Sequence, residues 1–96
     1  MNKGDVLFVR IDRKAREGKP SSEIFQAHLD YLTGIAAERE FYGGGFSDGP
    51  GGMILFRSAD REDAERLCRE DPIISSGFYE YDLYRWEILI DGPAGE

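Results

Sequence analysis

His28 and Asp71 are the residues of this chain whose side chains are best suited to acid–base chemistry. His28 is the only histidine. An imidazole has an unperturbed pKa of about 6.5, so it can give or take a proton near neutral pH. The residue lies three positions after Phe25 and four before Leu32, at the border of an apolar helical stripe. We expect His28 to be a general base if it faces a pocket, and a packing or capping residue otherwise.

Asp71 lies four residues after Leu67, so its carboxylate should emerge at the inner edge of a second helix, just before Pro72. From there it could point into the same pocket. The alternative is an Asp-Pro turn that ends the helix and leaves the carboxylate in solvent. A carboxylate at a helix C-terminus meets the unfavourable end of the helix dipole, a mild cost that hints at a further role.

Glycines and arginines supply candidate contacts for a ligand. Gly43, Gly44 and Gly45 lack the Lys-Ser/Thr pair that follows a phosphate-binding loop. They are either a strand kink that allows close backbone packing or a set of N–H groups exposed to an anionic substrate atom. The stretch 13–19 holds four cations and one acid. Arg13 and Arg16 in this stretch are candidate contacts for an anionic ligand, or part of a solvated loop.

Metal, cofactor and thiol chemistry find little support in the sequence. Cys68 is the only cysteine, so the chain can form neither an internal disulfide nor a CxxC redox pair. It follows Leu67 in an apolar stripe, where a small buried hydrophobe is expected rather than a nucleophile. A metal site would have to combine His28 with carboxylates such as Asp71, without any recognised ligand spacing. We therefore predict no metal site and no cofactor.

Four strands and two helices are expected to position these residues. The first strand, 6–11, is apolar and rich in β-branched residues, and a charged loop follows it. Pro20 and the serines after it start a helix over about 22–38. Strands at 39–47 and 53–57 flank an Asp-Gly-Pro-Gly turn and should form a hairpin. Asp60 should cap a second helix, which ends before Pro72.

The last strand is expected to be the longest, spanning 78–90. Its apolar residues change phase between Leu83 and Tyr84, which predicts a bulge or a strand that serves two faces. The segment 73–76 before it is too short to be more than a turn. Residues 91–96 are expected to form a frayed Gly/Pro tail.

The resulting order, βαββαβ, predicts an α+β ferredoxin-like fold: an antiparallel four-stranded sheet with two helices on one face. Ninety-six residues suit one domain, 1–96. Phe78, Tyr84, Trp86 and the aromatics near Gly43 would leave the second face apolar, which predicts a homodimer through this open face. A ligand site should then lie between the sheet, the first helix and the glycine segment.

Composition narrows the range of partners. Twelve Lys+Arg against nineteen Asp+Glu give a net charge of −7. This charge repels phosphate backbones and anionic headgroups, so nucleic acid and membrane surfaces are disfavoured as partners. The apolar runs are too short to span a bilayer, and the first residues lack an apolar leader segment. Together with the single cysteine, these features favour a cytoplasmic protein.

Taken together, these residues resemble the YCII-related (YciI-like) family of the dimeric α/β-barrel superfamily. The resemblance covers Val6 to about Ile88, and its most distinctive part is the His-Leu pair of the first helix combined with the Asp-Pro block. The segments that carry it are Ala27-His28-Leu29 with Tyr31-Leu32, the glycine-rich stretch 41–46, Gly52-Met53-Ile54-Leu55-Phe56, Asp71-Pro72 followed by Ser76-Gly77-Phe78, and Trp86.

The resemblance implies a His–Asp pair, one residue from each helix, that meets in a pocket proposed as an active site; here the pair is His28 and Asp71. Similar proteins include a dehydrochlorinase acting on a chlorinated hydroxyquinol and relatives of muconolactone isomerase, so the implied chemistry is proton transfer on a small ring compound. Many relatives carry an arginine three residues before the histidine, where this chain has Phe25. The residues that could replace this anion contact are Arg13, Arg16 and Lys19.

The leading hypothesis is a protein that binds a small anionic or phenolic metabolite and catalyses a lyase or isomerase step on it. His28 would be the general acid/base, and Asp71 would orient its imidazole. The alternative is a non-catalytic metabolite-binding or accessory module with the same pocket, since ferredoxin-like scaffolds host many functions. A cofactor-free monooxygenase acting on aromatic substrates is a third hypothesis.

Overall fold

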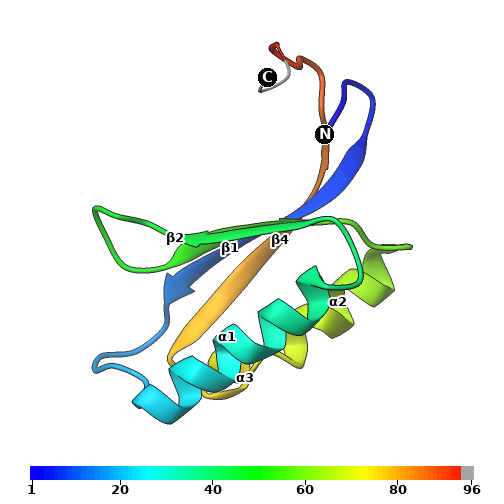
Figure 1. Ribbon diagram of the computed structural model, residues 1–96. Coiled ribbons are helices and arrows are strands. Elements are labelled where there is room, and N and C mark those ends of the chain that lie inside the picture. Colours follow the sequence, from blue (N-terminus) through cyan, green and yellow to red (C-terminus); the bar gives the residue numbers. More distant parts are fainter. Residues whose placement is uncertain (94–96) are drawn as a thin grey trace.

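The strands and helices confirm the predicted α+β, ferredoxin-like fold (Figure 1). The computed structural model describes residues 1–93, so residues 94–96 of the predicted tail lie outside it. The elements are β1 (Val6–Lys14), α1 (Ser22–Ala36), β2 (Phe41–Gly45), β3 (Gly52–Phe56), α2 (Arg61–Arg69), α3 (Pro72–Ser75) and β4 (Tyr79–Glu87). The predicted hairpin is present, because β2 and β3 pair as antiparallel neighbours.

The sheet is antiparallel throughout, with the strand order β2-β3-β1-β4. β1 pairs with β4 without interruption from Val6 opposite Glu87 to Lys14 opposite Tyr79. This pairing explains why β1 continues to Lys14, beyond the predicted end at Ile11: each of its residues has a partner in β4. The charged stretch after Ile11 is therefore partly strand.

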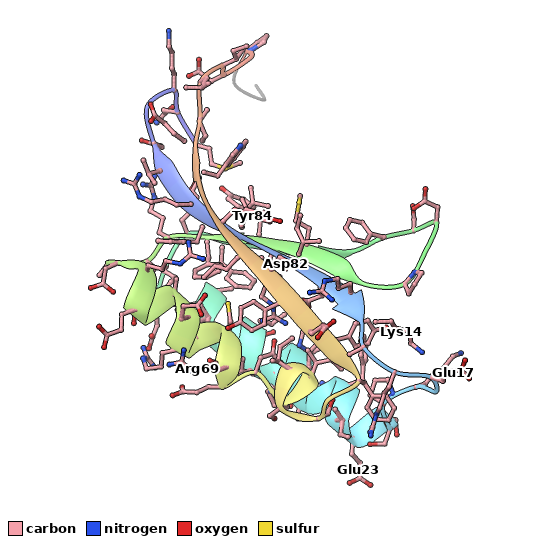
Figure 2. All side chains as sticks on the ribbon, turned by 180° about the vertical axis from the view of Figure 1, so that it is seen from behind. Lys14, Glu17, Glu23, Arg69, Asp82 and Tyr84 are labelled. Atoms are coloured by element: carbon pink, nitrogen blue, oxygen red, sulfur yellow. The ribbon has the colours of Figure 1, made fainter. Side chains whose placement is uncertain are left out.

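The uninterrupted pairing also decides between the two predictions for the last strand. A bulge would leave an extra residue on one strand, and the register has none. The second prediction, a strand that serves two faces, is confirmed: Leu83 is buried on the helix side, whereas Tyr84 is 54% exposed on the opposite side. Asp82 lies two residues before Tyr84 and shares this open face of β4; both are labelled in Figure 2.

The helices all lie on one face of the sheet (Figure 1). The main core lies between the sheet and α2, and it consists of Phe8, Ile54, Phe56, Ala64, Leu67, Cys68 and Leu83. α1 contributes no buried side chain. Its Leu32 and Ile35 are partly buried against the core, while Phe25 and Leu29 stay 50% and 41% exposed. The N-terminal half of α1 therefore stands off from the sheet.

Helix caps place the residues around Asp71. Ser21 and Asp60 cap α1 and α2, as the sequence predicts, by accepting hydrogen bonds from backbone N–H groups of the first turn. α2 ends at Arg69, and Asp71 is the N-cap of the one-turn helix α3, where it accepts from the N–H of Ile73. The expectation of a mere turn at 73–76 is thus wrong, because Pro72 suits the first turn of a helix. Asp71 meets the favourable end of a helix, not the unfavourable end.

Gly51 in the β2–β3 hairpin provides a test of this backbone arrangement. Its φ is +90°, and a Cβ there would collide with the carbonyl oxygen of Asp12. We expect Gly51→Ala to lower the free energy of unfolding in urea by about 3 kcal/mol, from backbone strain and the clash together. Gly77→Ala is the matched control, because its φ is +83° and a Cβ would meet nothing within 4 Å. Equal losses for both variants would contradict the predicted clash.

Candidate active site

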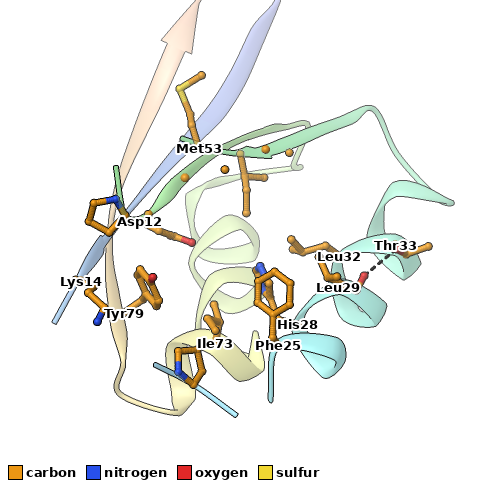
Figure 3. Close-up of a pocket in the computed structure, with 18 of the residues that line it drawn as sticks. Asp12, Lys14, Phe25, His28, Leu29, Leu32, Thr33, Met53, Ile73 and Tyr79 are labelled. Carbon is orange, nitrogen blue, oxygen red and sulfur yellow. Dashed lines mark hydrogen bonds between the residues drawn. The ribbon is translucent and has the colours of Figure 1, made fainter. Parts of the chain in front are cut away.

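A cleft of about 950 Å³ lies between α1 and the helix-facing side of the sheet, in the place predicted from the sequence (Figure 3). A volume of this size suits a small molecule. The polar side chains that line it are Asp12, Lys14, Lys19, His28, Thr33 and Tyr79. The larger apolar residues that line it include Pro20, Phe25, Leu29, Leu32, Ala36, Phe41, Pro50, Ile54 and Ile73.

His28 and Asp71 meet at the wall of this cleft. Nδ1 of His28 lies 2.8 Å from Oδ1 and 2.9 Å from Oδ2 of Asp71. The Asp71 side chain is 0% exposed and the His28 side chain 13%. α1 supplies the histidine one helical turn after Phe25, and the N-cap of α3 supplies the carboxylate. The structure therefore brings together the two residues that the sequence singled out.

Arg10 extends this pair into a chain of charges that the sequence analysis missed. Its Nη1 donates to Oδ2 of Asp71 at 2.9 Å. Its Nε and Nη2 donate to the two carboxylate oxygens of Asp12, at 2.6 and 2.8 Å. The Arg10 side chain is 2% exposed, and Asp12 is 8% exposed at the edge of the cleft. The order along the chain of contacts is His28–Asp71–Arg10–Asp12.

A signal for Arg10 was present in the first strand. Successive residues of a strand point to opposite faces, so Phe8, Arg10 and Asp12 share one face. Phe8 belongs to the buried core, which makes this the helix-facing side. A cation and an anion two residues apart on a buried face need each other as partners, and this pattern marks them as a buried ion pair.

The contacts fix the charges of the two central groups. Burial raises the pKa of Asp71, but the hydrogen bond with His28, the charge of Arg10 and the N–H of Ile73 outweigh it and hold that pKa below its usual value. Desolvation lowers the pKa of Arg10, but the carboxylates of Asp12 and Asp71 raise it above its usual value. Asp71 is therefore a carboxylate and Arg10 a guanidinium at neutral pH.

The His28–Asp71 contact specifies what the imidazole can do. A carboxylate only accepts hydrogen bonds, so the proton of a neutral imidazole belongs on Nδ1, facing Asp71. Nε2 then keeps a lone pair, and no group among residues 1–93 hydrogen-bonds to it. A side chain arranged in this way can take a proton from a molecule in the cleft, while Asp71 stabilises the imidazolium that forms.

Gly43, Gly44 and Gly45 are the last three residues of the edge strand β2, and all three line the cleft. A Cβ on Gly44 would meet nothing within 4 Å, and one on Gly45 only the carbonyl oxygen of Gly51 at 3.8 Å. A Cβ on Gly43 would lie 3.1 Å from the ring of Phe41. Gly45 thus leaves open space on the helix-facing side of the sheet, in addition to the backbone role considered from the sequence, whereas alternation turns Gly44, opposite Met53, to the open face.

Arg13 and Arg16 are not brought into the cleft. Arg13 lies on β1, where alternation turns it to the open face, and its guanidinium pairs with Glu80 and Asp82. Arg16 lies over the ring of Phe78, with Cζ 3.8 Å from the ring centroid. The cations that do line the cleft are Lys14 and Lys19.

Residues 1–93 contain neither a metal-binding cluster nor a membrane-spanning helix. Within residues 1–93, no group of three or more His, Cys, Asp or Glu side chains could hold a metal ion. No helix in the same part of the chain is long and apolar enough to cross a membrane. Burial raises the pKa of the Cys68 thiol to about 11, so this thiol is neutral and poorly nucleophilic at neutral pH.

Comparisons with known proteins agree with the family resemblance. The model of the YCII-related domain matches residues 6–87. The uncharacterized protein YjpA of Bacillus subtilis (strain 168) is 28% identical over 74 residues, which cover 76% of this chain and 87% of YjpA. A solved structure of 5-chloro-2-hydroxyhydroquinone dehydrochlorinase from Burkholderia phenoliruptrix AC1100, in complex with 2,5-dihydroxybenzoquinone, superposes with a TM-score of 0.64 and 24% identity, covering 84% of this chain and 93% of the other. At this identity the superposition shows a shared fold.

The lowered pKa of Asp71 predicts how stability depends on pH. Because the folded-state value lies below the unfolded one, the carboxylate stabilises the fold above the unfolded pKa, about 3.9, and this contribution is lost as the pH falls through the folded value. Asp71→Asn should lower the free energy of unfolding by about 3 kcal/mol at pH 7, since it breaks a buried ion pair. The difference between wild type and variant should shrink in urea titrations below pH 4.

Asp30→Asn is the control for this measurement. Asp30 lies exposed on α1, the helix that carries His28, so its loss should change the free energy of unfolding by no more than about 0.5 kcal/mol. A loss for Asp71→Asn that stays constant from pH 7 to pH 3 would show that Asp71 does not contribute through its charge.

Proposed function

The chain belongs to the YCII-related domain family, and we propose that it binds a small phenolic or anionic ring compound in its cleft and catalyses an acid–base lyase or isomerase step. The observation that carries the proposal is the 2.8 Å contact between His28 and the fully buried Asp71 at the cleft wall. A histidine oriented by a buried carboxylate, next to an otherwise apolar cavity, is an arrangement suited to proton transfer.

His28 is the general base in this proposal, and Asp71 is a positioning residue. Nε2 takes a proton from an O–H or C–H group of the bound ring, and the electron pair of that bond forms a new C=O or C=C bond. In an elimination, the leaving group departs with the electron pair of the bond that breaks. The imidazolium then returns its proton to solvent or, in an isomerisation, to another carbon of the same ring.

The choice of ligand class has two supports. Phe25 and Leu29 are half-exposed, yet they line the cleft beside His28, so they offer an apolar surface to a flat ring. The ring centroids of Phe25 and His28 lie 5.9 Å apart. The structural neighbour of the same fold is a dehydrochlorinase of a chlorinated hydroquinone, with a dihydroxybenzoquinone bound. Both supports favour a hydroxylated ring of similar size as the ligand of this chain.

A panel of chlorinated and hydroxylated hydroquinones tests the catalytic assignment. Wild-type protein should release chloride from at least one of them or isomerise it. Chloride titration measures the first reaction, and absorbance measures the second. His28→Asn should reduce the turnover number by about 10² to 10⁴-fold, the usual contribution of a general base. Asp71→Asn should reduce it by at least about 10²-fold, because the imidazole loses its orienting carboxylate.

Asp30→Asn is again the control, and it should turn over like the wild type. Wild-type turnover in His28→Asn would contradict the proposal that His28 is the base. Tight binding of panel members by the wild type, without any turnover, would instead support the alternative of a metabolite-binding or accessory module.

We also propose that two copies pair through the open face of the sheet. Four large side chains are 40–54% exposed on this face: Tyr42, Met53, Tyr84 and Trp86. A contiguous apolar face on one side of a sheet is a hallmark of an interface. An interface of this kind is self-complementary, because the same patch serves both copies.

Trp86→Glu should convert the dimer into a monomer, measured as a halved mass by light scattering after size-exclusion chromatography at micromolar concentration. The reason is that two like charges would be buried against an apolar partner surface. Leu29→Glu is the matched control: Leu29 is 41% exposed against 43% for Trp86, but it lies on the helix layer. A monomeric wild type, or equal dissociation by both variants, would contradict the proposed interface.

A further inference from the structure

We infer that Asp12 determines ligand specificity in the cleft: its carboxylate accepts a hydrogen bond from a ligand hydroxyl group and disfavours a ligand carboxylate. The inference rests on the proposed function and narrows its ligand class from phenolic or anionic compounds to rings that carry at least two hydroxyl groups. One hydroxyl group serves His28, and a second serves Asp12.

Asp12 reaches the cleft on its β3 side, where its neighbours across the sheet are glycines, whereas its partner on the other side is Tyr81 of β4. In the register of the sheet, Asp12 lies opposite Gly52 of β3, and Gly52 lies opposite Gly45 of β2. These three residues form one row on the helix-facing side, and two of them have no side chain. The Asp12 carboxylate therefore has an open path into the cleft, which it lines together with both glycines (Figure 3).

The carboxylate of Asp12 is held in place but not saturated. Each oxygen accepts one hydrogen bond from Arg10, at 2.6 and 2.8 Å. A carboxylate oxygen has two lone-pair sites, so each oxygen can accept one more bond. Asp71 holds Arg10 in place, and Arg10 in turn orients the carboxylate of Asp12 before any ligand binds. Ligand binding therefore costs little conformational entropy of the protein.

The charges at this end of the cleft disfavour an anionic ligand group. Asp12, Arg10 and Asp71 sum to one net negative charge when His28 is neutral, and the guanidinium is engaged by both carboxylates. The cations that line the cleft are Lys14, the last residue of β1, and Lys19, in the loop after β1. The Lys14 ammonium donates to the carbonyl of Gly18 in that loop. A hydroxyl group brings a donor to Asp12 without a like charge, so it fits better than a carboxylate.

Three ring compounds and two protein variants test the inference. Hydroquinone carries two hydroxyl groups, 4-methoxyphenol replaces one by a methyl ether, and 4-hydroxybenzoate replaces one by a carboxylate. Dissociation constants are measured by titration calorimetry at pH 7 for wild type, Asp12→Asn and the surface control Asp30→Asn. Changing the ligand group and the Asp12 side chain separately and together forms a thermodynamic cycle, which isolates the free energy of the contact between them.

We expect the wild type to bind hydroquinone at least ~10-fold more tightly than either other ring, as a hydrogen bond to a charged group allows. Asp12→Asn should reduce both ratios to about 3-fold or less, while Asp30→Asn keeps them. If Asp12→Asn does not fold, Asp12→Glu replaces it. This variant retains the charge beside Arg10 but shifts the carboxylate by one methylene, and it should also reduce the ratio between the diol and its methyl ether.

Two results would overturn the inference in distinguishable ways. If the wild type binds 4-hydroxybenzoate as tightly as hydroquinone or more tightly, or if Asp12→Asn leaves both ratios unchanged, Asp12 does not select the ligand, and the proposed function stands. If the wild type binds none of these rings or 2,5-dihydroxybenzoquinone, the proposed function fails and the inference falls with it.

Discussion

One buried carboxylate, that of Asp71, connects the elements on which the candidate active site depends. Its two oxygens accept hydrogen bonds from three elements: His28 of α1, Arg10 of β1 and the N–H of Ile73 in α3. Removing a carboxylate from water without partners costs several kcal/mol, so Asp71 stays buried only while these donors surround it. Since α1 has no buried side chain of its own, this polar contact is a main constraint on where α1 lies relative to the sheet.

Most of the fold follows from local patterns in the sequence. The Asp-Gly-Pro-Gly turn, the caps Ser21 and Asp60, and the apolar periods of strands and helices predict every element except α3. The same patterns could not show that α1 stands off from the sheet. Phe25 and Leu29 belong to a stripe that looks like core packing, but they line the cleft, since a side chain that contacts a ligand and one that fills a core have the same apolar chemistry.

The candidate site was only partly predictable. The types and spacing of His28 and Asp71, with the family resemblance, pointed to the pair, but the rest of the network depends on tertiary register. Arg10 gains its role because β1 places it on the helix-facing side beside Asp71. Arg13 and Arg16 illustrate the converse, since a local run of cations does not reveal which strand pairing or aromatic ring will engage each of them.

The central claim is that His28 is held by Asp71 through Nδ1 and presents Nε2 to the cleft. Because His28 is the only histidine, one pair of imidazole nitrogen signals reports on it. We would record ¹⁵N NMR spectra of these nitrogens at a pH where the ring is neutral, in the wild type and in Asp71→Asn. The account predicts a protonated Nδ1 and a bare Nε2 in the wild type, with the preference lost in the variant. A proton on Nε2 in the wild type would contradict the account. So would a mixture of both tautomers whose proportions are the same in the wild type and in Asp71→Asn.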